Sequence, residues 1–226
     1  AQAAREALRS GAVRDLYATG DAIARNAELL AGHDVSEISE RSAAALSETV
    51  TPQGLIAVCH LEEPTAAEVL QRAPKLLVVL VGPNDPGNLG TIVRTADAAG
   101  ADAIVVDGGV DPYNGKAVRA SAGSLFHLPI LECAAEDLLA GTHRIGMSAL
   151  ATTGHGARDL DTLGEDGTLA GPTVWLFGTE AHGLPEPVLA AADHAVRVPI
   201  YGRAESLNLS AAAAVCLYAS ARAQRR

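Results

Sequence analysis

The chain has 226 residues, of which 48% are hydrophobic, and its formal net charge at pH 7 is −10. This length and apolar content are sufficient for one sizeable core or two modest domains, so they exclude an intrinsically disordered chain. The sequence has no run of eighteen apolar residues, and its first residues lack the apolar centre of a signal peptide. We therefore expect a cytoplasmic protein that does not enter a membrane.

Residues 1–60 alternate helical and extended patterns, which predicts a small α/β domain. The expected elements, in chain order, are a helix over 3–10, a strand over 13–18, a helix over 21–31, a helix over 36–49 and a strand over 54–59. The sequence opens inside the first helical pattern, so we expect further residues upstream of Ala1. Residues 61–75 contain Glu62-Glu63-Pro64 and Ala73-Pro74, which favours a linker.

Apolar runs alternate with helical segments over residues 76–226, which is typical of a domain built on a mostly parallel sheet. The fold class expected from this pattern is α/β. Strands are expected over 76–81, 103–107, 130–132, 144–150, 174–177 and 195–198, and helices over 89–99, 116–120, 184–191 and 207–223.

The cysteines and charges limit the kinds of site that are expected. Cys59, Cys133 and Cys216 are widely spaced in apolar runs, which indicates buried thiols rather than a disulfide framework or a zinc site, and no metal is expected. The negative net charge argues against nonspecific binding of nucleic acid. Almost all the positive charge is arginine, which suits bidentate phosphate contacts, although a scattered arginine is more commonly part of a solvated surface.

A glycine-containing segment, Asn84 to Arg94 (NDPGNLGTIVR), follows the strand expected over 76–81 and enters a helix. Its glycines permit a tight turn, and the first N–H groups of the helix could hold a phosphate. The segment lacks the GxGxxG pattern of dinucleotide-binding proteins and the GxxxxGK[ST] pattern of P-loops, which argues against a nucleotide-binding oxidoreductase.

Two further segments follow later strands. Phe177 to Leu184 (FGTEAHGL) places Glu180 at the carboxyl end of a strand, where open α/β sheets bind ligands, although Glu180 could instead cap a helix. Val198-Pro199-Ile200 leads to Ser206 to Ser210 (SLNLS), in which Ser206 and Asn208 are good helix N-cap residues.

In order, spacing and position, these three segments resemble the signature motifs of the SpoU/TrmH family of SPOUT RNA methyltransferases, over about residues 76–218. The resemblance implies a C-terminal trefoil knot, a homodimer whose active sites are completed across the interface, and S-adenosylmethionine as cofactor. It implies methyl transfer to a ribose 2′-hydroxyl of RNA. Residues 1–60 look like part of a ribosomal-protein-type RNA-binding domain, which favours 23S ribosomal RNA as substrate and is compatible with a role in antibiotic resistance; transfer RNA is the alternative.

The resemblance also assigns residues. Arg94 matches the family's catalytic arginine, and Asn88 matches the asparagine that positions it; Glu180, Ser206 and Asn208 complete the catalytic set. The expected cofactor contacts are Leu150, Thr152, Gly178, Val198, Ile200, Leu207 and Leu209. Arg119 resembles a recurring family position and is interpreted as an RNA phosphate contact, with a solvated or intersubunit ion pair as the alternative.

The chemical role of Arg94 has two physical options. Because a guanidinium keeps its proton far above neutral pH, a base role would need a strongly altered environment. We favour a protonated Arg94 that stabilises the developing alkoxide while another group or water takes the proton. Two alternatives remain. The whole chain could be a noncatalytic knotted RNA-binding or assembly factor, although such a protein would have little need of the full set of motif residues. The N-terminal domain could serve only to pack or to dimerise.

Overall fold

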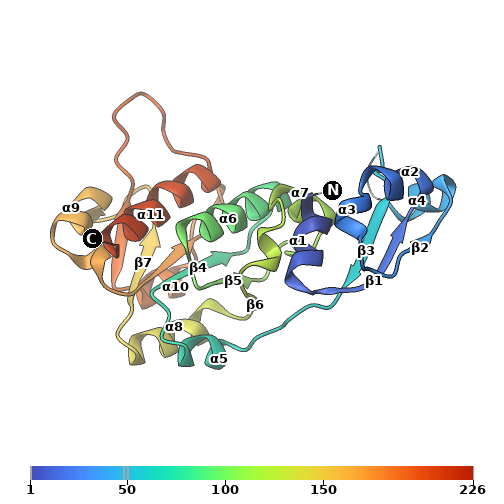
Figure 1. Ribbon diagram of the computed structural model, residues 1–226. Helices are drawn as coiled ribbons and strands as arrows, with labels where there is room; N and C mark the ends of the chain where they lie inside the picture. The colour runs from blue at the N-terminus through green and yellow to red at the C-terminus, as the bar shows by residue number, and fades with distance from the viewer. Residues whose placement is uncertain (1, 48, 50, 226) are drawn as a thin grey trace.

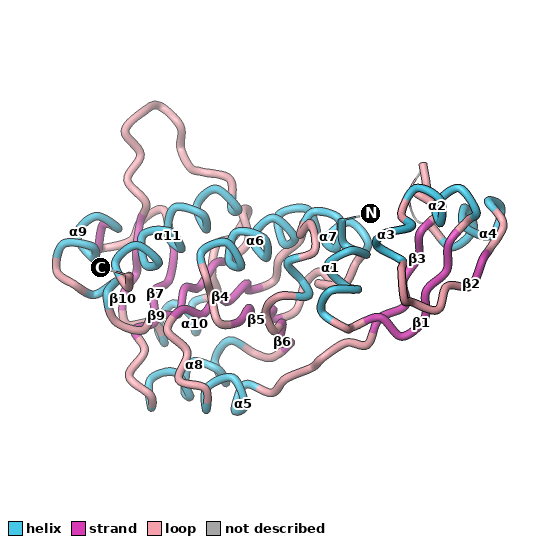
Figure 2. Tube along the Cα trace, viewed as in Figure 1, coloured by secondary structure: helices cyan, strands magenta, loops and turns pink. Residues whose placement is uncertain are grey.

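The computed structural model describes residues 2–47, 49 and 51–225, and it contains two separate sheets (Figures 1 and 2). The described residues do not include 1, 48, 50 and 226. The predictions for these positions, among them Glu48 of the helix expected over 36–49, therefore lie outside the described residues. The small sheet has the strand order β2-β1-β3 and the large sheet the order β6-β5-β4-β9-β7-β10-β8.

The small sheet is formed by β1 (Val13–Ala18), β2 (Ser36–Glu37) and β3 (Leu55–Cys59), in which β1 pairs in parallel with β2 and antiparallel to β3. Its helices are α1 (Gln2–Ser10), α2 (Gly20–Arg25), α3 (Ala27–Leu30) and α4 (Glu40–Leu46). The first helix and both long strands match the expected ones to within one residue at either end.

Two predictions for this region were wrong. The single helix over 21–31 is broken into α2 and α3, because the Asn26 side chain donates to the carbonyl oxygen of Ala22 at 2.8 Å and ends the first helix. The helix over 36–49 starts later than expected, because residues 36–37 pair with β1 and Ser39 caps α4 by accepting from the amide of Ser42 at 3.1 Å.

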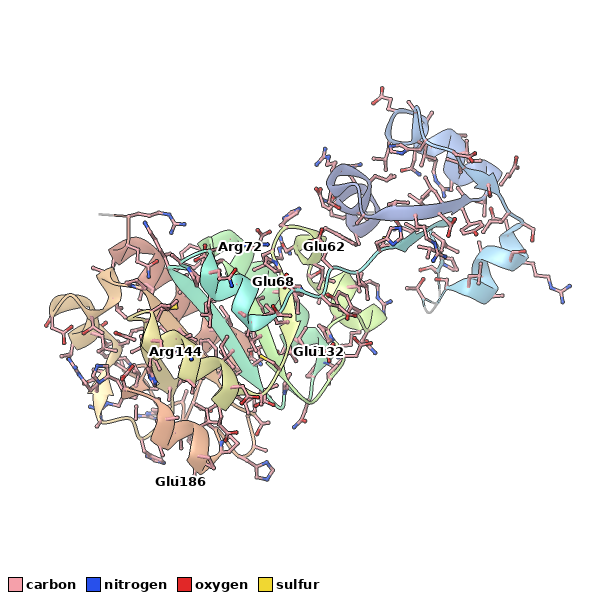
Figure 3. The ribbon with its side chains drawn as sticks, turned by 90° about the horizontal axis from the view of Figure 1, so that it is seen from below. Glu62, Glu68, Arg72, Glu132, Arg144 and Glu186 are labelled. Atoms are coloured by element: carbon pink, nitrogen blue, oxygen red, sulfur yellow. The ribbon has the colours of Figure 1, made fainter. Side chains whose placement is uncertain are left out.

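The segment expected as a linker contains a helix, α5 (Ala66–Gln71). A capping box between Thr65 and Glu68 starts this helix, and Leu70 packs where Gly141 leaves room on α8 (Ala135–Arg144). Figure 3 shows the extended chain that leaves the small sheet and reaches α5; Glu68 on this helix and Arg72 directly after it are labelled.

All the strand pairs of the large sheet are parallel, which confirms the predicted class. Its strands are β4 (Leu76–Val81), β5 (Ala103–Asp107), β6 (Ile130–Glu132), β7 (Ser148–Thr152), β8 (Arg158–Asp159), β9 (Thr173–Phe177) and β10 (His194–Arg197). The strand expected over 144–150 was placed too early, because α8 continues to Arg144 and a turn at Gly146, with φ of 77°, precedes β7. The trefoil knot stays a prediction.

Helices cover both faces of the large sheet, so its strands are buried on both sides. One core lies beneath α6 (Pro86–Ala99), α7 (Gly115–Ala120), α9 (Leu160–Glu165) and α11 (Leu209–Ala223), and the other beneath α5, α8 and α10 (Glu186–Ala191). The prediction missed α8, α9 and the short β8. Within the described ranges, no helix combines the length and apolar character needed to cross a membrane.

The cysteines differ in burial. Cys216 on α11 is buried, as expected, and burial raises the pKa of its thiol to about 12. The expectation of buried thiols is wrong for Cys59 and Cys133, which are half-buried because they end or follow edge strands of the two sheets.

Candidate functional site

Three loops of the large sheet converge at one place because their strands are neighbours. The order β4-β9-β7-β10 makes these strands adjacent, and since they are parallel, their carboxyl ends lie at one edge of the sheet. The segment after β4 starts α6, the segment after β9 contains Glu180, and the segment after β10 leads to α11. This edge is where open α/β sheets bind ligands.

The loop after β9 is held in a tight turn. Thr179 and Gly183 exchange two backbone hydrogen bonds, of 3.1 and 2.9 Å, and Gly183 has a φ of 66°. A Cβ on Gly178 would lie 2.1 Å from the carbonyl carbon of Gly183, so only glycine fits there. This turn fixes the backbone on which Glu180 stands.

The carboxylate of Glu180 joins the three sequence motifs. Its Oε1 accepts hydrogen bonds from Asn88 Nδ2 at 3.1 Å, from Asn208 Nδ2 at 2.8 Å and from the amide of Leu209 at 3.2 Å. The last donor belongs to the N-terminus of α11, where the helix dipole favours a negative charge. Glu180 is therefore bound by donors from α6 and from the start of α11.

Ser210 and the two asparagines complete this network. Asn88 Oδ1 accepts from Asn208 Nδ2 and from Ser210 Oγ, both at 3.2 Å. Asn208 Oδ1 accepts from the Ser210 amide at 3.0 Å and from Ser210 Oγ at 2.5 Å, so Asn208 is the N-cap of α11. The helix therefore begins two residues later than expected. The side-chain amide of Asn208 both caps α11 and binds Glu180.

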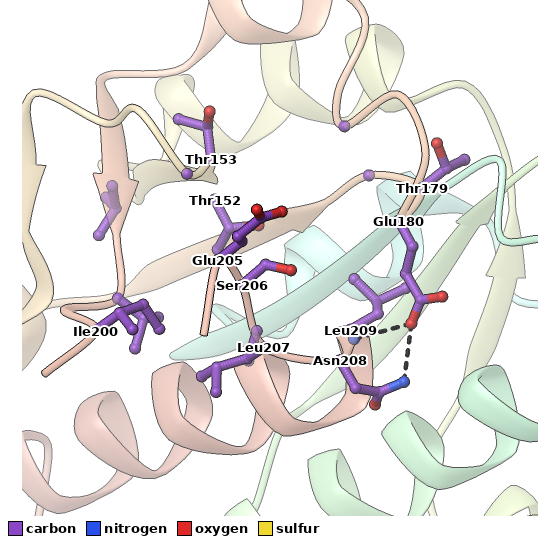
Figure 4. Close-up of a pocket in the computed structure, with 16 residues that line it drawn as sticks. Thr152, Thr153, Thr179, Glu180, Ile200, Glu205, Ser206, Leu207, Asn208 and Leu209 are labelled. Carbon is purple, nitrogen blue, oxygen red and sulfur yellow. Dashed lines mark hydrogen bonds between the residues drawn. The ribbon is translucent and has the colours of Figure 1, made fainter. Parts of the chain in front are cut away.

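A cavity of about 630 Å³ opens beside this network (Figure 4). Its walls come from the ends of β7, β9 and β10 and from the start of α11. The lining residues are Thr152, Thr153, Gly154, Gly178, Thr179, Glu180, Gly183, Val196, Val198, Ile200, Glu205, Ser206, Leu207, Asn208, Leu209 and Ala212. Volumes of this size are typical of small-molecule sites.

Most of the residues predicted from sequence gather at this cavity. Of the catalytic set, Glu180, Ser206 and Asn208 line it, and Asn88 contacts two of them. Of the cofactor set, all but Leu150 line it. Leu150 is fully buried, because it belongs to the core between the large sheet and the helices that include α11.

Arg94 and Arg119 lie apart from the cavity lining. Both are exposed, Arg94 on α6 and Arg119 on α7, and neither side chain makes a hydrogen bond or an ion pair with another residue in the part of the chain that the structure describes. The two helices pack closely, since a Cβ on Gly90 would lie 2.3 Å from the carbonyl oxygen of Ala117.

The start of α6 is anchored by an ion pair. Asp85 caps the helix by accepting from the amide of Gly87 at 2.5 Å, and it also binds Lys116 Nζ at 2.9 Å. The lysine contact, followed by the backbone bond, lowers the pKa of the Asp85 carboxyl. Asn88 lies three residues after this cap, in the first turn of α6.

Sequence reasoning missed several members of the site. Glu205 directly precedes the third motif, Ser210 ends that motif but was given no role, and Thr153-Gly154 directly follow β7, so a search of every polar residue after a strand end would have found them. Among the described residues, no group of three or more histidine, cysteine or acidic side chains is arranged to hold a metal ion.

A mostly parallel α/β sheet with a polar network and a ligand-sized cavity at its strand ends is the arrangement that the resemblance predicted. The family model for the SpoU rRNA methylase family matches residues 75–218. The chain belongs to this family.

Individual relatives extend the match over nearly the whole chain. A 23S rRNA (guanosine(2553)-2′-O)-methyltransferase of Bacillus subtilis, RlmP, is 35% identical over 214 residues, which cover 94% of this chain and 83% of the relative. The crystal structure of the SpoU methyltransferase AviRb from Streptomyces viridochromogenes with AdoMet matches with a TM-score of 0.80 and 30% identity, over 98% of this chain and 87% of that one. An AdoMet-bound rRNA methyltransferase from Sinorhizobium meliloti matches with a TM-score of 0.82 and 32% identity, over 96% and 83%.

Proposed function

We propose that this protein transfers a methyl group from S-adenosylmethionine to a ribose 2′-hydroxyl of 23S ribosomal RNA. The observation that carries the proposal is the network around Glu180, in which residues of all three motifs meet at the rim of a single cavity. A scaffold that only bound RNA would have no need to join these residues beside a cavity of cofactor size.

The cavity suits S-adenosylmethionine in size and chemistry. Val198, Ile200, Leu207 and Leu209 offer apolar walls for the adenine, and the backbone around Gly178 offers amide and carbonyl groups to its edge. Glu180 and Glu205 supply negative charge, which suits a cationic cofactor. The bound cofactor would supply an activated methyl group.

The residues of the chain would then provide positioning and charge. An in-line approach of the 2′-oxygen to the methyl carbon requires the ribose to be held in place, and fixed geometry of this kind accounts for a large part of such rate enhancements. We assign a protonated Arg94 to the developing alkoxide and the neighbouring phosphate, while the network of Asn88, Glu180 and Asn208 fixes the cavity rim.

A homodimer would bring Arg94 to a cavity. Arg94 lies outside the cavity lining of its own chain, and α11 exposes Val215 and Tyr218 at 43% and 52% of their surface. We propose that two copies pack through this face of α11 and that Arg94 of one copy serves the cavity of the other. Such apolar exposure is what an interface between subunits would cover.

The substrate assignment rests on the relatives. RlmP is named for a guanosine of 23S rRNA and another relative, from Streptomyces viridochromogenes, for a uridine of the same RNA. We propose 23S ribosomal RNA for this chain, residues 1–60 as the domain that binds it, residues 61–75 as the connection and residues 76–226 as the knotted methyltransferase domain. Arg119 would contact an RNA phosphate, and the location would be the cytoplasm, where ribosomes are assembled.

A direct test uses purified protein with cofactor labelled in its methyl group. We expect label in 23S rRNA, none in transfer RNA, and none in an oligonucleotide in which the target ribose is replaced by 2′-deoxyribose. Label in transfer RNA alone would redirect the substrate assignment. Label that persists on the deoxyribose substrate would show base methylation and would contradict the proposed chemistry.

A further inference from the structure

The cavity carries only one sign of formal charge. Its ionisable lining residues are Glu180 and Glu205, and none of the lining residues among those described is lysine, arginine or histidine. Both carboxylates are drawn in Figure 4 with the other lining side chains.

The two carboxylates differ in their surroundings. Oε1 of Glu180 accepts three N–H donors and holds the loops together, so its charge is partly used within the protein. Glu205 is exposed, and it makes no hydrogen bond or ion pair with any residue within the described ranges. Arg203 lies on the same loop but is not a lining residue. Glu205 therefore presents a free negative charge to whatever occupies the cavity.

The cofactor and its product differ by one positive charge. During methyl transfer the bond between the methyl carbon and sulfur breaks and its electron pair stays on sulfur, while the 2′-oxygen bonds the methyl carbon and its proton leaves to solvent or a base. The sulfonium thus becomes a neutral thioether, and an attraction between a carboxylate and the bound molecule is lost in the reaction.

We infer that Glu205 makes the cavity select the cationic cofactor S-adenosylmethionine over its neutral product S-adenosylhomocysteine, and so favours exchange of product for fresh cofactor. This inference rests on the proposed function. Because Glu205 is exposed, water screens its interaction with a nearby cation. A solvated ion pair of this kind corresponds to about a three- to fivefold change in Kd.

The test compares three ligands by calorimetry on the full chain: S-adenosylmethionine, S-adenosylhomocysteine, and sinefungin, which carries an ammonium group in place of the sulfonium and cannot donate a methyl group. We expect Glu205→Gln to weaken the two cationic ligands about three- to fivefold and to leave S-adenosylhomocysteine nearly unchanged. The loss should shrink when salt rises from about 0.05 to 0.5 M, since salt screens exposed charges.

Glu136→Gln is the matched control, because it makes the same change of net charge at an exposed position on α8 that does not line the cavity. It should leave all three Kd values unchanged. Equal weakening of all three ligands by Glu205→Gln, or no weakening of any, would overturn the inference while leaving the proposed function intact. Failure of the unaltered protein to bind S-adenosylmethionine would instead overturn the proposed function and the inference with it.

Discussion

The large sheet and the small sheet are stabilised to very different extents. Every residue of β4 is buried, and cores lie on both faces of its sheet, whereas every residue of β3 is only half-buried. Among the described residues, the core cluster of the small sheet contains three buried leucines, Leu8, Leu16 and Leu30. Since buried apolar area is the main source of stability, the large sheet provides a rigid base for the cavity, and the small sheet is the part that can adapt its shape.

The largest expected effect is at Arg94, which lies on the exposed surface of α6, over the large sheet. Arg94→Ala should lower methylation by at least about a hundredfold, because a charge that stabilises the reacting oxygen is lost. Cofactor affinity should stay nearly unchanged, because Arg94 does not line the cavity of its own chain and is assigned to the RNA at the cavity of the other copy. Arg94→Lys should also be severely impaired, since lysine lacks the planar fork. Near-normal turnover by folded Arg94→Ala would show that the catalytic role belongs elsewhere.

Asn208 should affect both binding and chemistry. Asn208→Ala removes the donors to Glu180 and Asn88 and the cap of α11, and loss of an N-cap alone costs about 1 kcal/mol. We expect weaker cofactor binding by calorimetry together with at least about tenfold lower activity. Asn114→Ala, which removes the cap of α7 outside the cavity, is the control for a purely structural effect. If both variants lose binding equally, the network has no special role.

Truncation of one leucine in each sheet should show how the two sheets differ in stability. Leu150→Ala in the large core should lower the free energy of unfolding by about 2–5 kcal/mol and destabilise the whole large sheet. Leu16→Ala should mainly increase hydrogen exchange over residues 13–59, leaving cofactor binding intact. Global loss of protection in Leu16→Ala would contradict the difference in stability between the two sheets.

The smallest expected effect is at the contact between the two regions. Glu6 of α1 lies against Gly123 and 3.5 Å from His127 Nε2, and His127 Nδ1 lies 2.7 Å from Asp97. The hydrogen bond to Asp97, with a contribution from Glu6, raises the pKa of His127. Arg9, at 3.1 Å from Glu6, is the other charged group of the cluster.

A raised pKa in the folded state means that protonated His127 stabilises the fold. This contribution is fully present below the ordinary histidine pKa of 6.5 and is lost as pH rises through the raised value. Because the ring is 41% exposed, we expect less than about 1 kcal/mol. The difference between the pH profiles of the free energy of unfolding for the unaltered protein and for His127→Gln measures this contribution. Identical profiles would show that protonated His127 does not stabilise the fold.

Sequence predicted the buried strands well and the capped segments poorly. The runs of β4, β5 and β6 are apolar and short, so their limits could be read directly, and the motifs at strand ends located the cavity. Asn26, Ser39 and Asn208 moved helix ends because one side-chain hydrogen bond decides each of them. Hydropathy carries no information about such bonds, nor about which strands of a sheet are neighbours and so bring their loops together.

The most direct measurement is a mass-spectrometric map of 2′-O-methyl marks on 23S rRNA from cells that lack this protein and are supplied with either the unaltered chain or Arg94→Ala. We expect one ribose to gain a methyl group with the unaltered chain and no ribose to gain one with the variant. Identical maps in the two cells, or a mark on a base in place of a ribose, would contradict this expectation.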